Sequence, residues 1–303
     1  MPRKLLIFGW LFLFITLSCT SGGAEQQDSA PVAASIYGEG SISSELPEFA
    51  TSFSSDGKTI YFNRASADRS SLQILTSTLT NGQWSEPIAL PFSDGKYFDV
   101  DPFVSSDGER LYFSSNRPVE GDSTKDFDTW YVERVDNGWS EPVNAGAPLN
   151  GPDSEVFVSL TNEQTIYFSI STNGVRRIYR SEQTANGYTP PSQIDVSVAD
   201  SIGMGNPLID PDERYLLFTS RQLDGYGAAD IFIVDHLGDG RFDNARNAGP
   251  AVNSAYSDFA PGFGADGETL YFTSERPGIV GPLEEGRPPG DLYEISLEAL
   301  PLN

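Results

Sequence analysis

Carboxylates are the residues of this sequence with the clearest capacity for chemistry. Two carboxylic acids that flank a glycosidic bond are enough for glycoside hydrolysis, and several carboxylate oxygens around one point could hold a hard cation such as Ca²⁺. Seven acids recur just before apolar segments and form the candidate binding rim: Glu45, Glu48, Asp99, Asp101, Asp153, Glu155 and Asp258. Four of them, Glu48, Asp99, Asp101 and Asp258, are the candidate catalytic acids.

Other common catalytic groups are scarce. Cys19 is the only cysteine and His236 is the only histidine. Zinc sites built from cysteine and histidine, and Cys–His nucleophile pairs, therefore lack the residues that they need. A Ser-His-Asp triad could use only His236, and no nucleophile-elbow sequence accompanies it.

The charge of the chain is strongly acidic. Its 43 acidic residues outnumber 19 basic ones, which gives a net charge of −24. Such a surface repels phosphate backbones, so nucleic acid is excluded as a partner. Aromatic residues make up 12% of the sequence, and acidic disordered chains are poor in aromatics. We therefore expect one globular domain.

A repeat of about 50 residues must position the carboxylates. The segments SSDGKTIYF (54–62) and SSDGERLYF (105–113) are nearly identical, and weaker copies end at Phe168, Phe218 and Phe272. A fixed period of this size indicates one supersecondary unit that is repeated. Within each copy, Asp-Gly or Asn-Gly turns separate short apolar runs, which is a strong hairpin signal. Each copy therefore predicts four antiparallel strands.

Five such units predict an all-β, five-bladed β-propeller. The fifth unit contains only three strand segments before the sequence ends. Residues 29–32 resemble residues 140–143, and residues 40–44 resemble residues 250–254. We therefore expect an N-terminal strand to complete the last blade, which closes the ring and removes free sheet edges.

The N-terminus has the layout of an export signal. Two basic residues precede an apolar run that is too short to span a bilayer, and Cys19 follows that run. Residues 1–18 are predicted to be a lipoprotein-type signal peptide, with an ordinary secretory signal as the alternative. A lipid on Cys19 would anchor the mature chain. Residues 19–34 would form a flexible tether, whose end can begin the closing strand, and residues 35–303 a single propeller domain.

Several motifs resemble those of a known family. The segments SSDGERLYFSSNRP (105–118), NGWSEPV (137–143) and LNGPDSE (149–155), with an aspartate-led aromatic strand between the first two, are similar to WD40-like or PD40 repeats. The TolB propeller and many bacterial envelope lipoproteins share these repeats. The resemblance implies a periplasm-facing binding propeller, generally without catalysis. It covers about residues 29–300, and the third repeat departs from it most.

Arginines that follow the second strand of a unit recur together with aspartates that open the third strand. The three pairs are Arg117 with Asp128, Arg221 with Asp230, and Arg276 with Asp291. In the first and third units, both positions are changed together. We therefore expect these residues to form structural ion pairs within a blade, which order the loops between them.

In an up-and-down blade, the loops between strands two and three lie on the same face as the inter-blade links. The seven carboxylates should therefore gather on one rim with the long loops 117–127, 221–229 and 276–290, near the aromatic residues Tyr97, Phe98, Tyr226 and Tyr256.

The leading hypothesis is a monomeric, non-enzymatic binding propeller at the outer membrane that presents this acidic rim to an envelope protein or a glycan. The alternative is a glycoside hydrolase-like enzyme that uses the channel carboxylates. A purely structural role is a third possibility.

Overall fold

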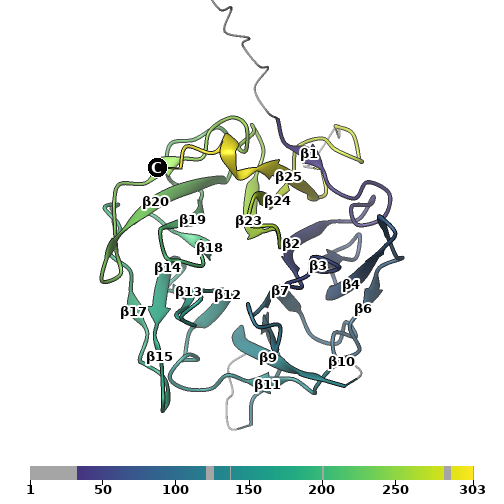
Figure 1. The fold of residues 1–303 in the computed structure, drawn as a ribbon. Coiled ribbons are helices and arrows are strands. Elements are labelled where there is room, and N and C mark those ends of the chain that lie inside the picture. The colour runs from purple at the N-terminus through teal and green to yellow at the C-terminus, as the bar shows by residue number, and fades with distance from the viewer. Residues whose placement is uncertain (1–32, 121–125, 137, 200, 283–287, 303) are drawn as a thin grey trace, which may run out of the picture. The chain divides into compact units, whose positions relative to one another are not determined.

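The structure is a computed structural model that describes residues 33–120, 126–136, 138–199, 201–282 and 288–302. Within them, small antiparallel sheets are arranged as the five blades of a propeller (Figure 1). The predicted all-β, five-bladed fold is confirmed. The described residues include one short 3₁₀ helix, Leu297–Ala299, and no helix among them is long and apolar enough to cross a membrane. Cys19 and the predicted signal peptide lie outside the described residues.

Three long strands form the body of each blade. In blade order they are β2 (Glu48–Phe53), β3 (Thr59–Ala65) and β4 (Leu72–Thr80); β7 (Asp99–Val104), β8 (Arg110–Ser115) and β9 (Asp128–Val135); β12 (Ser154–Leu160), β13 (Ile166–Thr172) and β14 (Val175–Ser181); β18 (Gly205–Ile209), β19 (Tyr215–Ser220) and β20 (Asp230–Gly238); β23 (Asp258–Phe263), β24 (Thr269–Ser274) and β25 (Asp291–Ser296). The first strand of each blade lies nearest the central axis (Figure 1).

The outermost strand of a blade is short. It consists of β5 (Gln83–Trp84) and β6 (Ile88–Ala89) in blade one, β10 (Gly138–Trp139) and β11 (Val143–Asn144) in blade two, β17 (Ser192–Gln193) beside the hairpin β15 (Gln183–Thr184) and β16 (Gly187–Tyr188) in blade three, and β21 (Arg241–Phe242) and β22 (Arg246–Asn247) in blade four. The predicted fourth strand of a blade is therefore interrupted. In blades one and two, Pro87 and Pro142 lie at the interruption. Proline has no N–H to donate to a neighbouring strand, so the ladder breaks there.

An N-terminal strand completes blade five, as predicted. β1 (Ser35–Ile36) pairs antiparallel with β25, and Ile36 lies opposite Tyr293. Residues 29–32, which resemble an outer strand in sequence, lie outside the described residues.

The seam between the last blade and the first is built like two of the other seams. In each, the first strand donates a backbone N–H to the residue just before the third strand of the preceding blade: Glu48 to Gly290, Glu155 to Phe127, and Asp258 to Ala229. The ring is therefore closed by the same backbone bond that joins consecutive blades.

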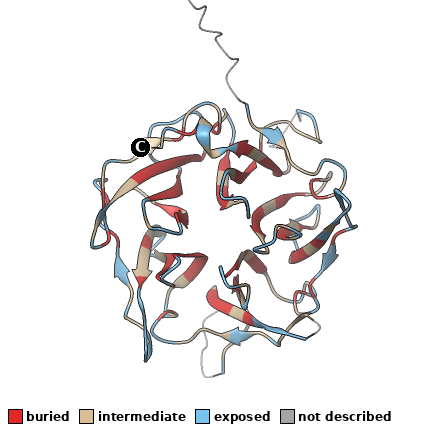
Figure 2. Cartoon of the chain, in the orientation of Figure 1, coloured by how far each residue is buried: buried red, intermediate tan, exposed pale blue. Residues whose placement is uncertain are grey.

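The second strand of each blade forms the centre of the core. Its repeated phenylalanines, Phe62, Phe113, Phe168, Phe218 and Phe272, are all 0% exposed. Burying each of these side chains contributes about 1.5–3 kcal/mol. Figure 2 shows buried residues along the strands of every blade and exposed residues mainly on the outer strands and connecting loops. The consecutive apolar runs are thus strands covered on both faces, as their sequence indicated.

Every inner strand contains one residue with a left-handed backbone, a feature that the sequence did not predict. These residues are Ala50, Asp101, Phe157, Asn206 and Ala260, with φ between 49° and 59°. The register between the first and second strands shifts at each of them, as in a β-bulge. Ala50, Phe157 and Ala260 come from three different blades and pack together. The five residues therefore surround the central channel.

Candidate functional site

Three of the predicted rim carboxylates are buried in ion pairs. Glu48, Asp99 and Asp258 are each exposed by 1% or less. Each lies against an arginine of its own blade: Glu48 Oε1 is 2.6 Å from Arg64 Nε, Asp99 Oδ2 is 2.7 Å from Arg117 Nη2, and Asp258 Oδ1 is 2.8 Å from Arg276 Nη2. These acids therefore do not form an accessible acidic rim.

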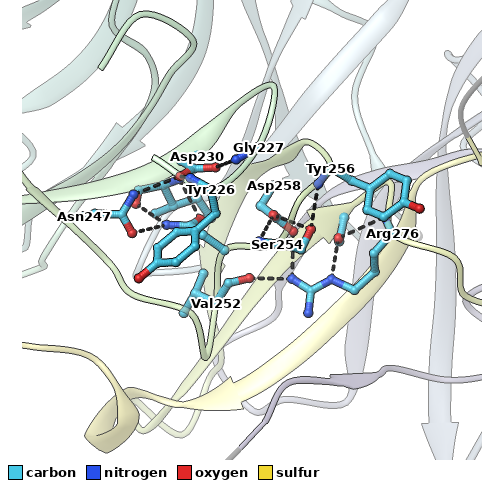
Figure 3. A network of polar contacts seen from close by, with 12 residues as sticks. Tyr226, Gly227, Asp230, Asn247, Val252, Ser254, Tyr256, Asp258 and Arg276 are labelled. Carbon is cyan, nitrogen blue, oxygen red and sulfur yellow. Dashed lines mark hydrogen bonds and ion pairs between the residues drawn. The ribbon is translucent and has the colours of Figure 1, made fainter. Parts of the chain in front are cut away.

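The arginines also fix the links between blades. Arg276 Nη2 donates to the Val252 carbonyl as well as to Asp258, and its Nε donates to Ser274 Oγ at 2.7 Å (Figure 3). Ser254 donates both its N–H and its hydroxyl to Asp258 Oδ2. The hydrogen-bonding capacity of this carboxylate is thus used within the fold.

The predicted ion pairs named the wrong acidic partners. Arg117 and Arg276 contact the acids of the first strand, whereas Asp128 and Asp291 open the third strand. Asp128 Oδ2 accepts a hydrogen bond from an asparagine amide of the outer strand at 2.7 Å. Asp291 Oδ2 accepts a backbone N–H of the loop before it at 3.0 Å. The physical reason is the position of these aspartates: Asp291 caps the backbone of the loop before the third strand, and Asp128 binds the neighbouring outer strand.

Blade four shows the same capping. Asp230 accepts hydrogen bonds from the backbone N–H groups of Tyr226 and Gly227 and from Asn247 Nδ2 (Figure 3). Its predicted partner, Arg221, forms none of the ion pairs found among the described residues. The loop is therefore ordered by its aspartate without the arginine.

Blade three keeps the first-strand acid but has no arginine beside it. Glu155 is 1% exposed, and its Oε2 has no hydrogen-bond partner. Ile170 lies opposite Glu155 in the register in which Arg64 lies opposite Glu48. Burial, together with three nearby aspartates, raises the pKa of Glu155 to about 8. Glu155 is thus a buried carboxyl that is largely protonated at neutral pH.

Asp101 is the carboxylate that lies in the channel. It lines cavities on both sides of the ring of left-handed residues. Burial raises its pKa to about 7, against the opposing charge of Arg176. Of the remaining rim acids, Glu45 is exposed, and Asp153 accepts a hydrogen bond from Thr172 Oγ1 at 2.9 Å.

The structure does not bring the acids together as a metal site. Among the described residues, no group of three or more His, Cys, Asp or Glu side chains is arranged to hold a metal ion. The ion pairs explain this for the first-strand acids, since a guanidinium already occupies the position beside three of them.

The mouth of the channel contains a cavity of about 430 Å³ beside the inter-blade links. Apolar side chains line one part of it, chiefly Phe49, Leu72, Phe127 and Phe259. The remaining lining residues include the charged Asp101, Arg176 and Arg221 and the neutral polar Ser154, Ser171, Asn206 and Thr219. A neighbouring cavity of about 360 Å³ is also lined by Arg176 and Arg221. Both arginines are exposed, and neither belongs to an ion pair within the described part of the chain.

A third cavity, of about 260 Å³, lies on the other side of the channel, toward the hairpin turns between strands one and two. Its wall includes Pro102, Phe103, Leu208 and Pro261. Asp101 is the one charged residue among the described residues that line it. The cavities at the channel mouth therefore combine charge with apolar surface, which is the usual composition of a binding site.

Of the aromatic residues expected on the rim, two are exposed. Tyr226 and Tyr256 are 51% and 36% exposed and flank the link between blades four and five (Figure 3). The Arg117 guanidinium lies 5.2 Å from the ring centroid of Tyr97, so this ring packs on an ion pair. The exposed tyrosines extend the candidate surface beyond the channel mouth.

Sequence reasoning missed Arg176 and the cavity phenylalanines. A signal for the latter was present, because Phe49 and Phe259 directly follow the first-strand acids Glu48 and Asp258. An alignment of the repeats at this position would have predicted a ring of apolar residues next to the acids. No comparable signal distinguishes Arg176, because the third repeat is the most divergent.

Comparisons with solved structures support the fold. A protein described as TolB from Agrobacterium tumefaciens matches with a TM-score of 0.52 and 16% identity, over 86% of this chain and 80% of that one. A thermostable family-43 glycoside hydrolase matches with a TM-score of 0.57 and 11% identity, over 84% of this chain and 91% of that one. A GH62 hydrolase in complex with xylotriose matches with a TM-score of 0.50 and 12% identity, over 88% of this chain and 95% of that one.

The chain has a TolB-like β-propeller fold. At these identities the similarity shows the fold alone, because binding proteins and hydrolases share it. No protein-family model matches the sequence, and no curated protein is similar to it. The function of this propeller must therefore be argued from its own residues.

Proposed function

We propose that this protein is a non-enzymatic binding propeller, anchored by a lipid on Cys19 in the outer membrane of a bacterium, where it faces the periplasm and binds an envelope protein or a glycan. The signal-like N-terminus and the single cysteine after it support the anchoring. The observation that supports binding most strongly is the pair of connected cavities at the channel mouth, which contain two arginines without an ion-pair partner among the described residues.

The burial of the candidate acids favours binding over hydrolysis. Glycoside hydrolysis requires two carboxyl groups that both reach the scissile bond. Glu48, Asp99 and Asp258 are exposed by 1% or less and are held by arginines. Of the four catalytic candidates, Asp101 alone remains in the channel, and one carboxyl cannot serve as both acid and base at the same step.

The binding function predicts a partner that depends on the channel mouth. We expect the full-length lipoprotein, used as bait in detergent-solubilised envelope, to retain a specific protein or glycan. Arg176→Gln with Arg221→Gln should reduce that retention at least about tenfold, because charge-assisted hydrogen bonds contribute about 1.5–3 kcal/mol each. The matched control is Arg241→Gln, an exposed arginine of β21 that lines neither cavity. Retention that is the same for all variants would contradict this placement of the site.

One observation favours the glycoside hydrolase alternative. The pKa of Asp101, raised to about 7 by burial, lies in the range of a general acid. We nevertheless expect no turnover of aryl glycosides by the wild-type protein. Turnover that disappears in Asp101→Asn and persists in Asp153→Asn, a rim acid outside the cavity walls, would replace the binding proposal with an enzymatic one.

A further inference from the structure

The charge at the channel mouth is opposite to the charge of the protein. The chain has a net charge of −24, yet the exposed charged side chains of the two connected cavities are Arg176 and Arg221. The first-strand acids Glu48, Asp99 and Asp258 already have arginines of their own. An anion that enters the mouth therefore meets guanidinium groups that no carboxylate of the described fold neutralises by direct contact.

The local structure holds the two arginines beside one another. Arg176 lies on β14 against Gly205, and a Cβ at Gly205 would lie only 2.8 Å from Arg176 Cδ. Arg221 follows β19 directly, and Thr219 near the end of that strand lines both cavities with a hydroxyl that has no hydrogen-bond partner. Guanidinium forks and a nearby hydroxyl are the donors that a carboxylate accepts best.

The apolar side of the same cavity comes from other blades. Phe49 belongs to β2, Phe259 to β23, and Phe127 precedes β9. Phe49 and Phe259 pack against the cluster of Ala50, Phe157 and Ala260 around the channel. The apolar wall is therefore supported from behind, while the arginines stand on blades three and four. The site divides into an apolar part and a cationic part.

This division selects one class of ligand. A sugar presents hydroxyl groups that must be paired when buried. The phenylalanine, leucine and valine side chains of this cavity offer no such partner, whereas Ser154, Ser171, Asn206 and Thr219 of the same cavity do. An aliphatic or aromatic amino-acid side chain can be buried against the apolar wall without removing any polar group from water. A carboxylate beside that side chain would reach the arginines. A peptide segment matches all three kinds of lining, with an apolar side chain for the phenylalanines, a carboxylate for the arginines and amide groups for the neutral polar side chains.

We propose that the connected cavities at the channel mouth bind a peptide segment of a protein partner, with a carboxylate of the segment on Arg176 and Arg221 and an adjacent apolar side chain against Phe49, Phe127 and Phe259. This inference rests on the proposed binding function and names its ligand class. Asp101 lines the same cavity as Arg176, so a bound carboxylate would lie near this acid.

The test uses two small probes that differ by one charge. N-acetyl-L-phenylalanine and its amide are titrated into the full-length lipoprotein in detergent, and binding is followed by ligand-observed NMR with protein-free micelles as the blank. We expect saturable binding of the carboxylate probe and about tenfold or more weaker binding of the amide. The double variant Arg176→Gln with Arg221→Gln should bind the carboxylate probe as weakly as the amide. Arg241→Gln should leave the affinity for both probes unchanged.

Several results would overturn the inference. They are equal binding of the two probes, absence of saturable binding, and binding of glucuronate that equals or exceeds that of N-acetyl-L-phenylalanine, which would point to an acidic glycan. Thermal unfolding of each variant verifies that it is folded. If the envelope experiment yields a partner but the probes fail, the peptide inference is wrong and the binding function stands. If no partner is retained, the binding function itself fails.

Discussion

Arg276→Met is expected to lower the free energy of unfolding of the propeller by about 3–5 kcal/mol. Asp258 is 0% exposed and lies 2.8 Å from Arg276, so removing the guanidinium leaves a buried charge without its counterion. The same variant also loses the bond to the Val252 carbonyl, which holds the link between blades four and five (Figure 3). Urea unfolding at pH 7, followed by circular dichroism, measures the difference.

The control for this prediction is an ion pair at the surface. Glu133 lies 3.0 Å from Arg110 and its side chain is 52% exposed, so Glu133→Gln should cost less than about 1 kcal/mol. Methionine at position 276 is also unbranched and apolar, which limits the loss of packing, but it loses the guanidinium contact 4.7 Å from the Tyr293 ring centroid. If Arg276→Met costs no more than Glu133→Gln, the first-strand acids do not depend on their arginines, and the structural role assigned to the three ion pairs is wrong.

Glu155→Gln is expected to stabilise the propeller at alkaline pH. The folded pKa of Glu155 is about 8, raised from 4.5 by burial, so the folded state holds a proton that the unfolded state releases. The wild-type protein must therefore lose stability as pH rises from about 4.5 to 8, and the loss is complete above pH 8. Glutamine does not titrate. At pH 9 the variant should be more stable than the wild type by about 3–5 kcal/mol.

At pH 4 the same variant should differ little from the wild type, because Glu155 is protonated in both states there. Asp101 and Asp291 also titrate between these limits, with pKa values raised by burial to about 7 and about 6. Both proteins contain them, so the difference between the two stability curves isolates Glu155. Glu48→Gln is the matched control: it removes the partner of Arg64 and should destabilise at pH 7. A pH-independent effect of Glu155→Gln would show that Glu155 is ionised in the folded protein.

The repeats predicted the fold because each one carries the local signals of a blade. The copies of SSDGxxxYF set the number of blades, and their turn residues set the hairpins. The closing strand was predicted as an element, while residues 29–32, which resemble an outer strand, lie outside the described residues. β1 has two residues, and so short a strand leaves almost no pattern in a sequence. The five left-handed residues were also missed, because none of them is a glycine.

The candidate site was predicted less well because burial and pairing depend on distant residues. Arg117 and Arg276 stand four residues after the phenylalanine of their repeats, whereas Arg221 stands three residues after Phe218. The equivalent of Arg117 in blade four is Gln222, and the equivalent of Asp99 is Met204. Blade four has thus lost both members of the ion pair, and its arginine lines the cavity instead.

The sequence by itself determined the all-β class, the five blades, the four strands in each and the need for an N-terminal strand, because these follow from patterns within about 50 residues. Only the tertiary structure decided which charges reach the channel mouth. At the channel mouth, five inner strands that are about 50 residues apart in sequence lie around one axis. In three blades, the acid of the inner strand is buried in an ion pair with an arginine and does not reach the surface. A chain with a net charge of −24 consequently presents arginines at its candidate site.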